Sequence, residues 1–433
     1  MDNRQSWLGT RLQRAPQRVL TLYAVAAAFS TYFCMYAFRK PFSAAEYHGQ
    51  ELWGLHLKDA LVISQIVGYT LSKYIGIKVC SEATPRRRGV LLVTLILAAE
   101  AALVLFAVVP PQWRFVAIFL NGLPLGMVWG LVVAYLEGRR TSELLLAGLS
   151  CSFIVSSGAV KTVGRSLLTD YGFSEAWMPA ATAGLFLVPY LVAVWLLKQV
   201  PQPTSQDVRA RVEREPMDKS HRLAFIKHFL PGLLLLFTFY FFVTAFRDLR
   251  DNFSAEIFSQ LGYGEEPAIF VKSELWVGFG VLVAMAAINL IKDNRWGVAG
   301  TYGIMLLGTL MLGVATSFYD RQQISGVTWM ILIGLGTYLV YVPYGSVLFD
   351  RLIASTKVAG TAVFAIYLAD ALGYTGSIGV LLYKNYSHSQ LSWLAFMRGF
   401  SYVMCGLGIA CLISSFLYFW FGHMPARREP PAA

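Results

Sequence analysis

Eight lysine and arginine side chains fall inside strongly apolar runs of the sequence. They are Arg39, Lys73, Lys161, Arg165, Arg247, Arg250, Lys272 and Arg398. A cation at the middle of a membrane helix costs roughly 2.5–3.5 kcal/mol on insertion scales, so each should face protein or water rather than lipid. Fewer acidic residues share these runs, chiefly Glu100, Asp248, Asp251, Glu274 and Asp370. We therefore expect a net positive interior that binds an anion.

Two of these arginines occupy matching sequences about half a chain apart. Residues 37–44 read AFRKPFSA, while residues 245–248 read AFRD and are followed by FSA at 253–255. If the two halves pack as a repeat, Arg39 and Arg247 face one another across its axis. Guanidinium groups stay protonated and bind phosphate or carboxylate oxygens in a bidentate manner. The pair predicts one shared anionic ligand, although Arg247 and Arg250 could instead be neutralised within their own helix by Asp248 and Asp251.

Further side chains could complete such a site. Lys73 offers a point charge, and Lys161 and Arg165, one helical turn apart, could either extend the anion site or snorkel outward. Hydroxyl, indole and ring contacts for the organic part of a ligand are available from Tyr36, Tyr69, Trp129, Tyr240, Tyr341 and Tyr374. Asp370 and Glu100 are proton-coupling candidates, with a structural ion pair as the alternative for each. We expect Lys272, Glu274 and Arg398 at the membrane interface.

The amino-acid composition indicates that these charged residues belong to a membrane protein. Of 433 residues 56% are hydrophobic and 14% charged, and the mean hydropathy is +0.54. That leaves too little polar surface for a soluble protein and predicts an integral, multi-pass membrane protein in a lipid bilayer. The five cysteines have no metal-ligand spacing. The net charge of +11 lies mainly in short loops, which argues against a nucleic-acid partner.

Apolar segments predict an all-α fold with twelve transmembrane helices. They recur at about 20–50, 57–79, 89–109, 115–136, 144–168, 177–197, 229–250, 269–291, 298–318, 326–349, 358–383 and 393–421. Lys and Arg predominate in the N-terminus, the even-numbered loops and the tail, so both termini should be cytoplasmic. The domains we expect are a cytoplasmic N-terminus (1–18), a first six-helix bundle (19–197), a cytoplasmic linker (198–228), a second six-helix bundle (229–421) and a cytoplasmic tail (422–433).

Other motifs are few. Gly122, Gly126 and Gly130 are spaced four apart and predict close packing of one helix on another. The sequence has no Walker loop, dinucleotide fingerprint, HExxH motif or nucleophile elbow. We expect a protein that is not an enzyme and uses neither a cofactor nor a metal.

Several short stretches of the sequence form a recognisable set. They are YAFRKPF at 36–42, LSKYIG at 71–76, PRRR at 85–88, FLNG at 119–122 with Gly126 and Trp129, and KVAGTA at 357–362 with Gly373 and Tyr374. Together they resemble the organophosphate:phosphate antiporters of the major facilitator superfamily. The resemblance implies the major facilitator fold, phosphate binding by Arg39 and Arg247, and assistance from Lys73. The sequence departs from the family where Lys161 and Arg165 replace a pocket histidine and where Asp248 and Asp251 cluster.

These observations predict an alternating-access secondary transporter for a small organic anion. A phosphorylated or phosphonate-type substrate is expected, with inorganic phosphate as the exchange partner that the resemblance implies. Two alternatives remain open: a proton-coupled carrier of a carboxylate or siderophore-like anion, and a transporter-like sensor of a sugar phosphate. We expect a monomer in a bacterial inner membrane.

Overall fold

The structure is a computed structural model that describes residues 7–136, 142–202, 219–356, 362–387 and 390–424. Parts of the predicted N-terminus, linker and tail lie outside the described residues. So do Arg139 and Arg140 of one predicted cytoplasmic loop, and the first five residues of the 357–362 motif.

The helices of the first part of the chain follow one another with short connections. They are α1 (Trp7–Arg14), α2 (Gln17–Met35), the 3-10 turns η1 (Tyr36–Phe38) and η2 (Pro41–Ala44), α3 (Leu57–Glu82), α4 (Pro85–Val108), η3 (Pro111–Trp113), α5 (Arg114–Leu136), α6 (Ser142–Thr169) and α7 (Met178–Leu197). Two-residue strands β1 (Glu51–Leu52) and β2 (Leu55–His56) pair antiparallel ahead of α3.

The second part of the chain is again helical. It contains α9 (Lys219–Asn252), α10 (Ser254–Gln260), α11 (Ile269–Leu290), α12 (Asn294–Asp320), α13 (Gly326–Pro343), the π-helical turn η4 (Tyr344–Leu348), α14 (Phe349–Thr356), α15 (Ala362–Ser387) and α16 (Trp393–Gly422). The prediction of an all-α fold is confirmed for the described residues, in which the short β1–β2 pair is the only sheet.

The chain forms two compact units that we call unit 1 and unit 2. Unit 1 comprises Met1–Val212, Leu249–Phe279 and Leu381–Leu394, and unit 2 comprises Glu213–Asp248, Gly280–Val380 and Ala395–Ala433. The boundaries cut through α9, α11, α15 and α16, so each of these helices contributes residues to both units. This division follows contacts rather than sequence halves, and the two predicted six-helix bundles remain a prediction.

Nine helical segments of the described residues are long and apolar enough to cross a membrane. They are α2 with η1, α4, η3 with α5, α7, α9, α11, α12, α13 to α14, and α16. The predicted spans at 57–79, 144–168 and 358–383 coincide with α3, α6 and α15, which are not among these nine. The count of twelve crossings therefore stays a prediction. Side chains such as Leu185 and Val188 on α7 are 60% and 68% exposed, as apolar groups that face lipid would be.

The first predicted span, at about 20–50, is interrupted near its middle. Helix α2 stops at Met35, and one 3-10 turn carries the chain to Phe38, whereas the apolar segment runs on to about residue 50. Pro41 explains why the helix does not resume, because proline has no N–H to donate and its ring would clash with the carbonyl four residues earlier in a continuous α-helix. The interruption places Arg39 and Lys40 on a short non-helical segment between η1 and η2.

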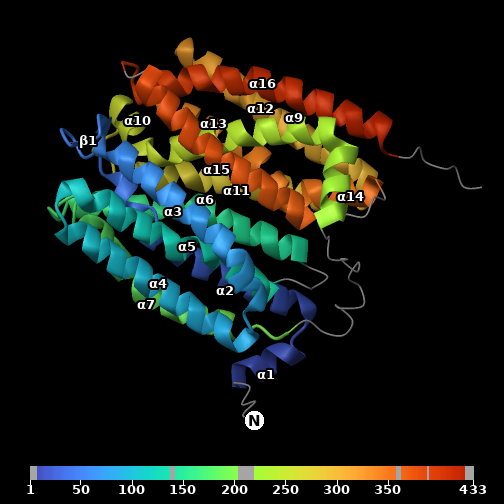
Figure 1. The fold of residues 1–433 in the computed structure, drawn as a ribbon, viewed down its shortest axis with the longest axis horizontal. Helices are drawn as coiled ribbons and strands as arrows, with labels where there is room; N and C mark the ends of the chain where they lie inside the picture. The colour runs from blue at the N-terminus through green and yellow to red at the C-terminus, as the bar shows by residue number, and fades with distance from the viewer. Residues whose placement is uncertain (1–6, 137–141, 203–218, 357–361, 388–389, 425–433) are drawn as a thin grey trace, which may run out of the picture. The chain divides into compact units, whose positions relative to one another are not determined.

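Helices α3 and α5 approach one another closely within unit 1, where α5 also packs on α4 (Figure 1). Glycines make this possible: a Cβ at Gly122 would lie 2.6 Å from Gln65 O, and one at Gly126 would lie 2.5 Å from Tyr69 O. Gly68 of α3 faces the Phe119 carbonyl in the same way. The predicted packing role of these glycines is confirmed at Gly122 and Gly126. Their close contact holds α3, which carries Tyr69 and Lys73, against α5.

Candidate functional site

In unit 1, Arg39 and Lys73 lie on one aromatic side chain. The Arg39 guanidinium carbon is 4.0 Å from the centre of the Tyr69 ring, and Lys73 Nζ is 5.5 Å from the same ring. Tyr69 and Lys73 are four residues apart on α3 and therefore share a face of that helix. Arg39 is 7% exposed. Two cations of the predicted anion site are thus brought together in a largely buried place.

Aromatic residues extend this group along α2 and α5. The Tyr36 ring centre is 5.8 Å from the Arg39 guanidinium, and Tyr32 touches both Tyr36 and Trp129 edge to face at 5.6 and 4.9 Å. We call Arg39, Lys73, Tyr36, Tyr69 and Trp129 the N-terminal basic cluster. All five are predicted site residues, and the structure links them by direct or successive ring contacts.

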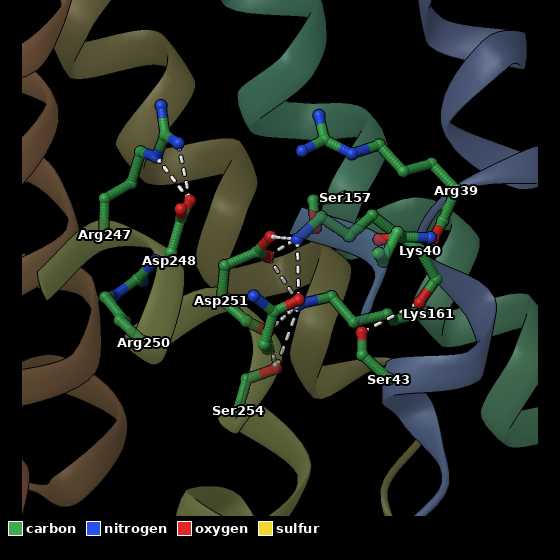
Figure 2. Close-up of polar contacts among 12 residues, drawn as sticks. Arg39, Lys40, Ser43, Ser157, Lys161, Arg247, Asp248, Arg250, Asp251 and Ser254 are labelled. Carbon is green, nitrogen blue, oxygen red and sulfur yellow. Dashed lines mark hydrogen bonds and ion pairs between the residues drawn. The ribbon is translucent and has the colours of Figure 1, made fainter. Parts of the chain in front are cut away.

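Lys161, a further predicted ligand residue, belongs to a different group in unit 1. Its Nζ donates to Asp251 Oδ1 at 2.7 Å, to the Asp251 carbonyl at 2.7 Å and to Ser254 Oγ at 3.0 Å (Figure 2). Lys40 pairs with the other carboxylate oxygen, Asp251 Oδ2, at 2.5 Å. Ser157 Oγ also donates to Asp251 Oδ1. Lys40 was not among the predicted site residues. The signal in the sequence that could have identified it is its place directly after Arg39.

The remaining cations of this region also meet acceptors of the protein. Arg165 donates to the Gly264 carbonyl at 2.8 and 3.1 Å and lies 3.7 Å from Glu46. Lys58, which is 2% exposed, pairs with Glu256 of α10 at 2.6 Å. Burial raises the pKa of the Glu256 carboxyl above its ordinary value, while the Lys58 charge opposes that rise. Whether Lys161 and Arg165 also contact a ligand remains a prediction.

Arg250 does not pair as the sequence suggested. The expectation was neutralisation within α9, but Arg250 Nη1 lies 2.8 Å from Glu274 of α11, and both residues are buried. Glu274 was expected at the membrane interface and is 8% exposed instead. The physical reason is that Asp251 already pairs with Lys40 and Lys161. The Arg250 charge is therefore neutralised by Glu274 of α11.

In unit 2, Arg247 stacks on an aromatic side chain at the same distance as Arg39 does in unit 1. Its guanidinium carbon is 4.0 Å from the Tyr341 ring centre. Nε and Nη2 of Arg247 both donate to a single oxygen, Asp248 Oδ1, while Asp248 Oδ2 accepts from Ser377 at 2.7 Å. Arg247 thus pairs with Asp248 of its own helix, which is the alternative that the sequence left open, although the pair lacks the two-oxygen fork that a bidentate carboxylate makes.

Tyrosines surround Arg247 and connect it to Asp370. Tyr240 stacks on Tyr341 at 5.4 Å, and the Tyr240 hydroxyl donates to Asp370 Oδ1 at 2.7 Å. Tyr374 is buried one helical turn after Asp370 on α15. We call Arg247, Tyr240, Tyr341, Tyr374 and Asp370 the C-terminal basic cluster. All five were predicted from the sequence.

Glu100, the other proton-coupling candidate, lies on α4. Its Oε1 is near Gly184 of α7, where a Cβ would be 3.9 Å away. Its Oε2 is buried and, within the part of the chain that the structure describes, accepts no hydrogen bond. Arg398, expected at the interface, is partly exposed and pairs with Asp320 at 2.6 Å.

Comparisons with known proteins identify the fold. A family model described as "Family of unknown function (DUF5690)" matches residues 41–421. No curated protein matches the sequence. The structure is similar to that of a D-xylose-proton symporter (TM-score 0.58, 14% identity, 94% of this chain and 97% of that one). It is also similar to that of the nucleoside transporter NupG (TM-score 0.59, 12% identity, 92% and 99%). At such identities the likeness shows a major facilitator-type fold.

Proposed function

We propose that the chain, which belongs to the DUF5690 family, is an alternating-access secondary transporter of a small organic anion. The transport role is supported by the fold it shares with a sugar symporter and a nucleoside transporter, both of which carry small molecules. The anionic substrate is supported by the N-terminal basic cluster, in which Arg39 and Lys73 bring two positive charges to one ring. We propose a phosphorylated or phosphonate-type anion, exchanged for inorganic phosphate, and a bacterial inner membrane as the location.

The observation that carries this proposal is the stacking of Arg39 on Tyr69. The guanidinium carbon of Arg39 lies 4.0 Å from the centre of the Tyr69 ring, so the ring orients the guanidinium by a cation–π contact. The planar guanidinium is the group best suited to bind an oxyanion with two parallel hydrogen bonds. Lys73 adds a second positive charge at the same ring.

Arg247 completes the proposed site on the evidence of the sequence repeat. We propose that Arg247, like Arg39, binds the substrate anion during transport. An anion that neutralises these buried cations would lower the barrier between the states of the transporter, whereas the empty protein would change state slowly. Such a protein exchanges anions rather than leaking them.

Ligand-induced stabilisation and uptake test the proposal directly. Phosphate, phosphate esters and phosphonates should raise the melting temperature of the purified protein, because ligands that bind only the folded state stabilise it. Liposomes loaded with phosphate should then take up at least one of the esters. Arg39→Lys and Arg247→Lys should lower both signals, while Arg398→Lys, an arginine in a partly exposed ion pair, should leave them unchanged. Equal signals in all three variants would refute the proposal.

A proton-coupled carrier of a carboxylate is the second candidate, and one contact favours it. Asp370 accepts a 2.7 Å hydrogen bond from Tyr240, which stacks on the same Tyr341 ring as Arg247. Protonation of Asp370 would therefore alter the surroundings of Arg247. Uptake driven by an imposed pH gradient and lost in Asp370→Asn would select this function, and uptake that depends on internal phosphate alone would exclude it.

A further inference from the structure

The interruption after α2 leaves two backbone carbonyls inside the protein, and two side-chain amides bind them. Asn121 Nδ2 of α5 donates to Phe38 O at 2.9 Å, and Gln65 Nε2 of α3 donates to Arg39 O at 2.8 Å. The exposed fractions of Asn121 and Gln65 are 0% and 4%. A buried carbonyl without a partner is costly, so these contacts stabilise the non-helical path of the chain at Arg39.

The two amides also hold each other. Gln65 Nε2 gives its second hydrogen to Asn121 Oδ1 at 3.0 Å, and Asn121 Nδ2 gives its second hydrogen to Ala99 O of α4 at 3.1 Å. All four N–H groups thus meet oxygen atoms. Rotating either amide by half a turn would place oxygen against oxygen, so the orientation of both side chains is fixed.

Close packing of α3 on α5 makes this pair possible. Gly122 follows Asn121 directly, and a Cβ at Gly122 would be 2.6 Å from the carbonyl of Gln65 itself. The two amides therefore lie where the backbones of α3 and α5 are in direct contact. Helices joined in this way are rigid supports, which is what a precisely placed binding group needs.

One face of α3 contacts both the backbone carbonyl and the guanidinium of Arg39. Gln65, Tyr69 and Lys73 are spaced four apart and line one side of the helix. Gln65 binds the Arg39 carbonyl, and Tyr69 lies against the Arg39 guanidinium. Main chain and side chain of Arg39 are thus located by a single helix.

We infer that Asn121 and Gln65 are positioning residues for anion binding by Arg39. This inference rests on the proposed function, because it assigns the amides the task of placing the guanidinium for an oxyanion. Neither amide need touch the substrate. Their loss should let the segment from Tyr36 to Ala44 move, and the affinity for the anion should fall while the rest of unit 1 keeps its packing.

Two variants and one matched control test the inference in the full-length protein. Gln65→Met keeps the length of the side chain but removes the donor, and Asn121→Asp keeps the shape but turns an oxygen toward Phe38 O. Tyr23→Phe is the control. It removes a different side-chain donor to a backbone carbonyl of unit 1, because the Tyr23 hydroxyl of α2 donates to Leu196 O of α7 at 2.8 Å.

Hydrogen exchange and phosphate binding are the measurements. Exchange of the amides of residues 36–44 should become about tenfold faster in Gln65→Met and Asn121→Asp, as loss of one buried hydrogen bond allows. Amides of α4 that precede Ala99, residues 89–95, should exchange as in the parent. Calorimetry should show about tenfold weaker binding of inorganic phosphate in both variants and parental values in Tyr23→Phe.

Each outcome decides the matter. Unchanged exchange at 36–44, faster exchange throughout unit 1, or faster local exchange with undiminished phosphate affinity would overturn the positioning role. A parent protein stabilised neither by phosphate nor by its esters would overturn the proposed function. In that event the exchange at 36–44 would still show whether the amides hold the segment.

Discussion

Asp251 shows how a single carboxylate organises several cations. Its two oxygens and its carbonyl accept from Lys40, Lys161 and Ser157. These three donors come from the chain before residue 162, and the acceptor comes from the end of α9. In unit 1 this one residue therefore ties a segment of the second half of the sequence to helices of the first half.

Removing the Asp251 charge should be strongly destabilising. Asp251→Asn leaves Lys40 and Lys161 buried without their carboxylate, and breaking a buried pair costs about 3–5 kcal/mol. The free energy of unfolding in detergent measures this loss. Asp320→Asn, which disrupts the partly exposed pair with Arg398, should cost at most about 1 kcal/mol.

A double variant checks the cause. In Lys161→Met with Asp251→Asn, one of the two stranded cations is gone, so the loss should be smaller than the sum of the two single losses. Strictly additive losses would show that Asp251 and Lys161 do not stabilise each other.

At the scale of elements, two breaks in regularity matter most. Pro41 prevents α2 from continuing beyond η1 and so leaves Arg39 on a short segment, and Pro343 at the end of α13 precedes the π-helical turn η4. Both were visible as prolines in apolar runs. The sequence did not reveal that side chains of α3 and α5 would bind the carbonyls that the first break releases.

The packing of α3 on α5 gives a testable contrast between two glycines. Gly122→Ala would bring a Cβ within 2.6 Å of Gln65 O and 2.9 Å of Tyr69 N, which are backbone atoms that cannot rotate away. We expect a loss of about 1–3 kcal/mol in the free energy of unfolding.

Gly303→Ala on α12 is the matched substitution. Nothing lies within 4 Å of its Cβ, so the better helix propensity of alanine should leave the stability unchanged or raise it by up to about 1 kcal/mol. Equal losses in both alanine variants would show that helix-wide effects, rather than the α3–α5 contact, set the result at Gly122.

For the whole molecule, the charge distribution predicts the orientation in the membrane. Both termini and the connection at 198–228 should be cytoplasmic, and the turn after α6 at Gly172 should be on the outer side. Alkaline phosphatase fused after Gly172 should be active in a bacterial host, whereas a fusion after Gln202 should be inactive. The reverse pattern would overturn the predicted topology.

The two compact units are a property of the folded molecule that the sequence halves did not predict. Residues 249–279 and 381–394 belong to unit 1, although they follow the long polar connection in the chain. The reason lies in side chains such as Asp251 and Glu256, whose partners Lys40 and Lys58 are far away in sequence.

The helical membrane fold and the members of both clusters could be predicted from residue types and spacing. A continuous apolar run of about 20 residues satisfies its backbone in lipid as an α-helix, and cations inside such runs must gather away from lipid. Arg39, Tyr69 and Lys73 could therefore be found from residue type and spacing alone.

Which charges pair, and what holds Arg39 in place, depends on the folded structure. The partners of Asp251, Arg250 and the amides of Gln65 and Asn121 come from other segments of the chain, and hydrogen bonds depend on distances and angles that no spacing along a chain encodes. The rigid contact of α3 with α5 sets those distances, because glycine lets two backbones touch.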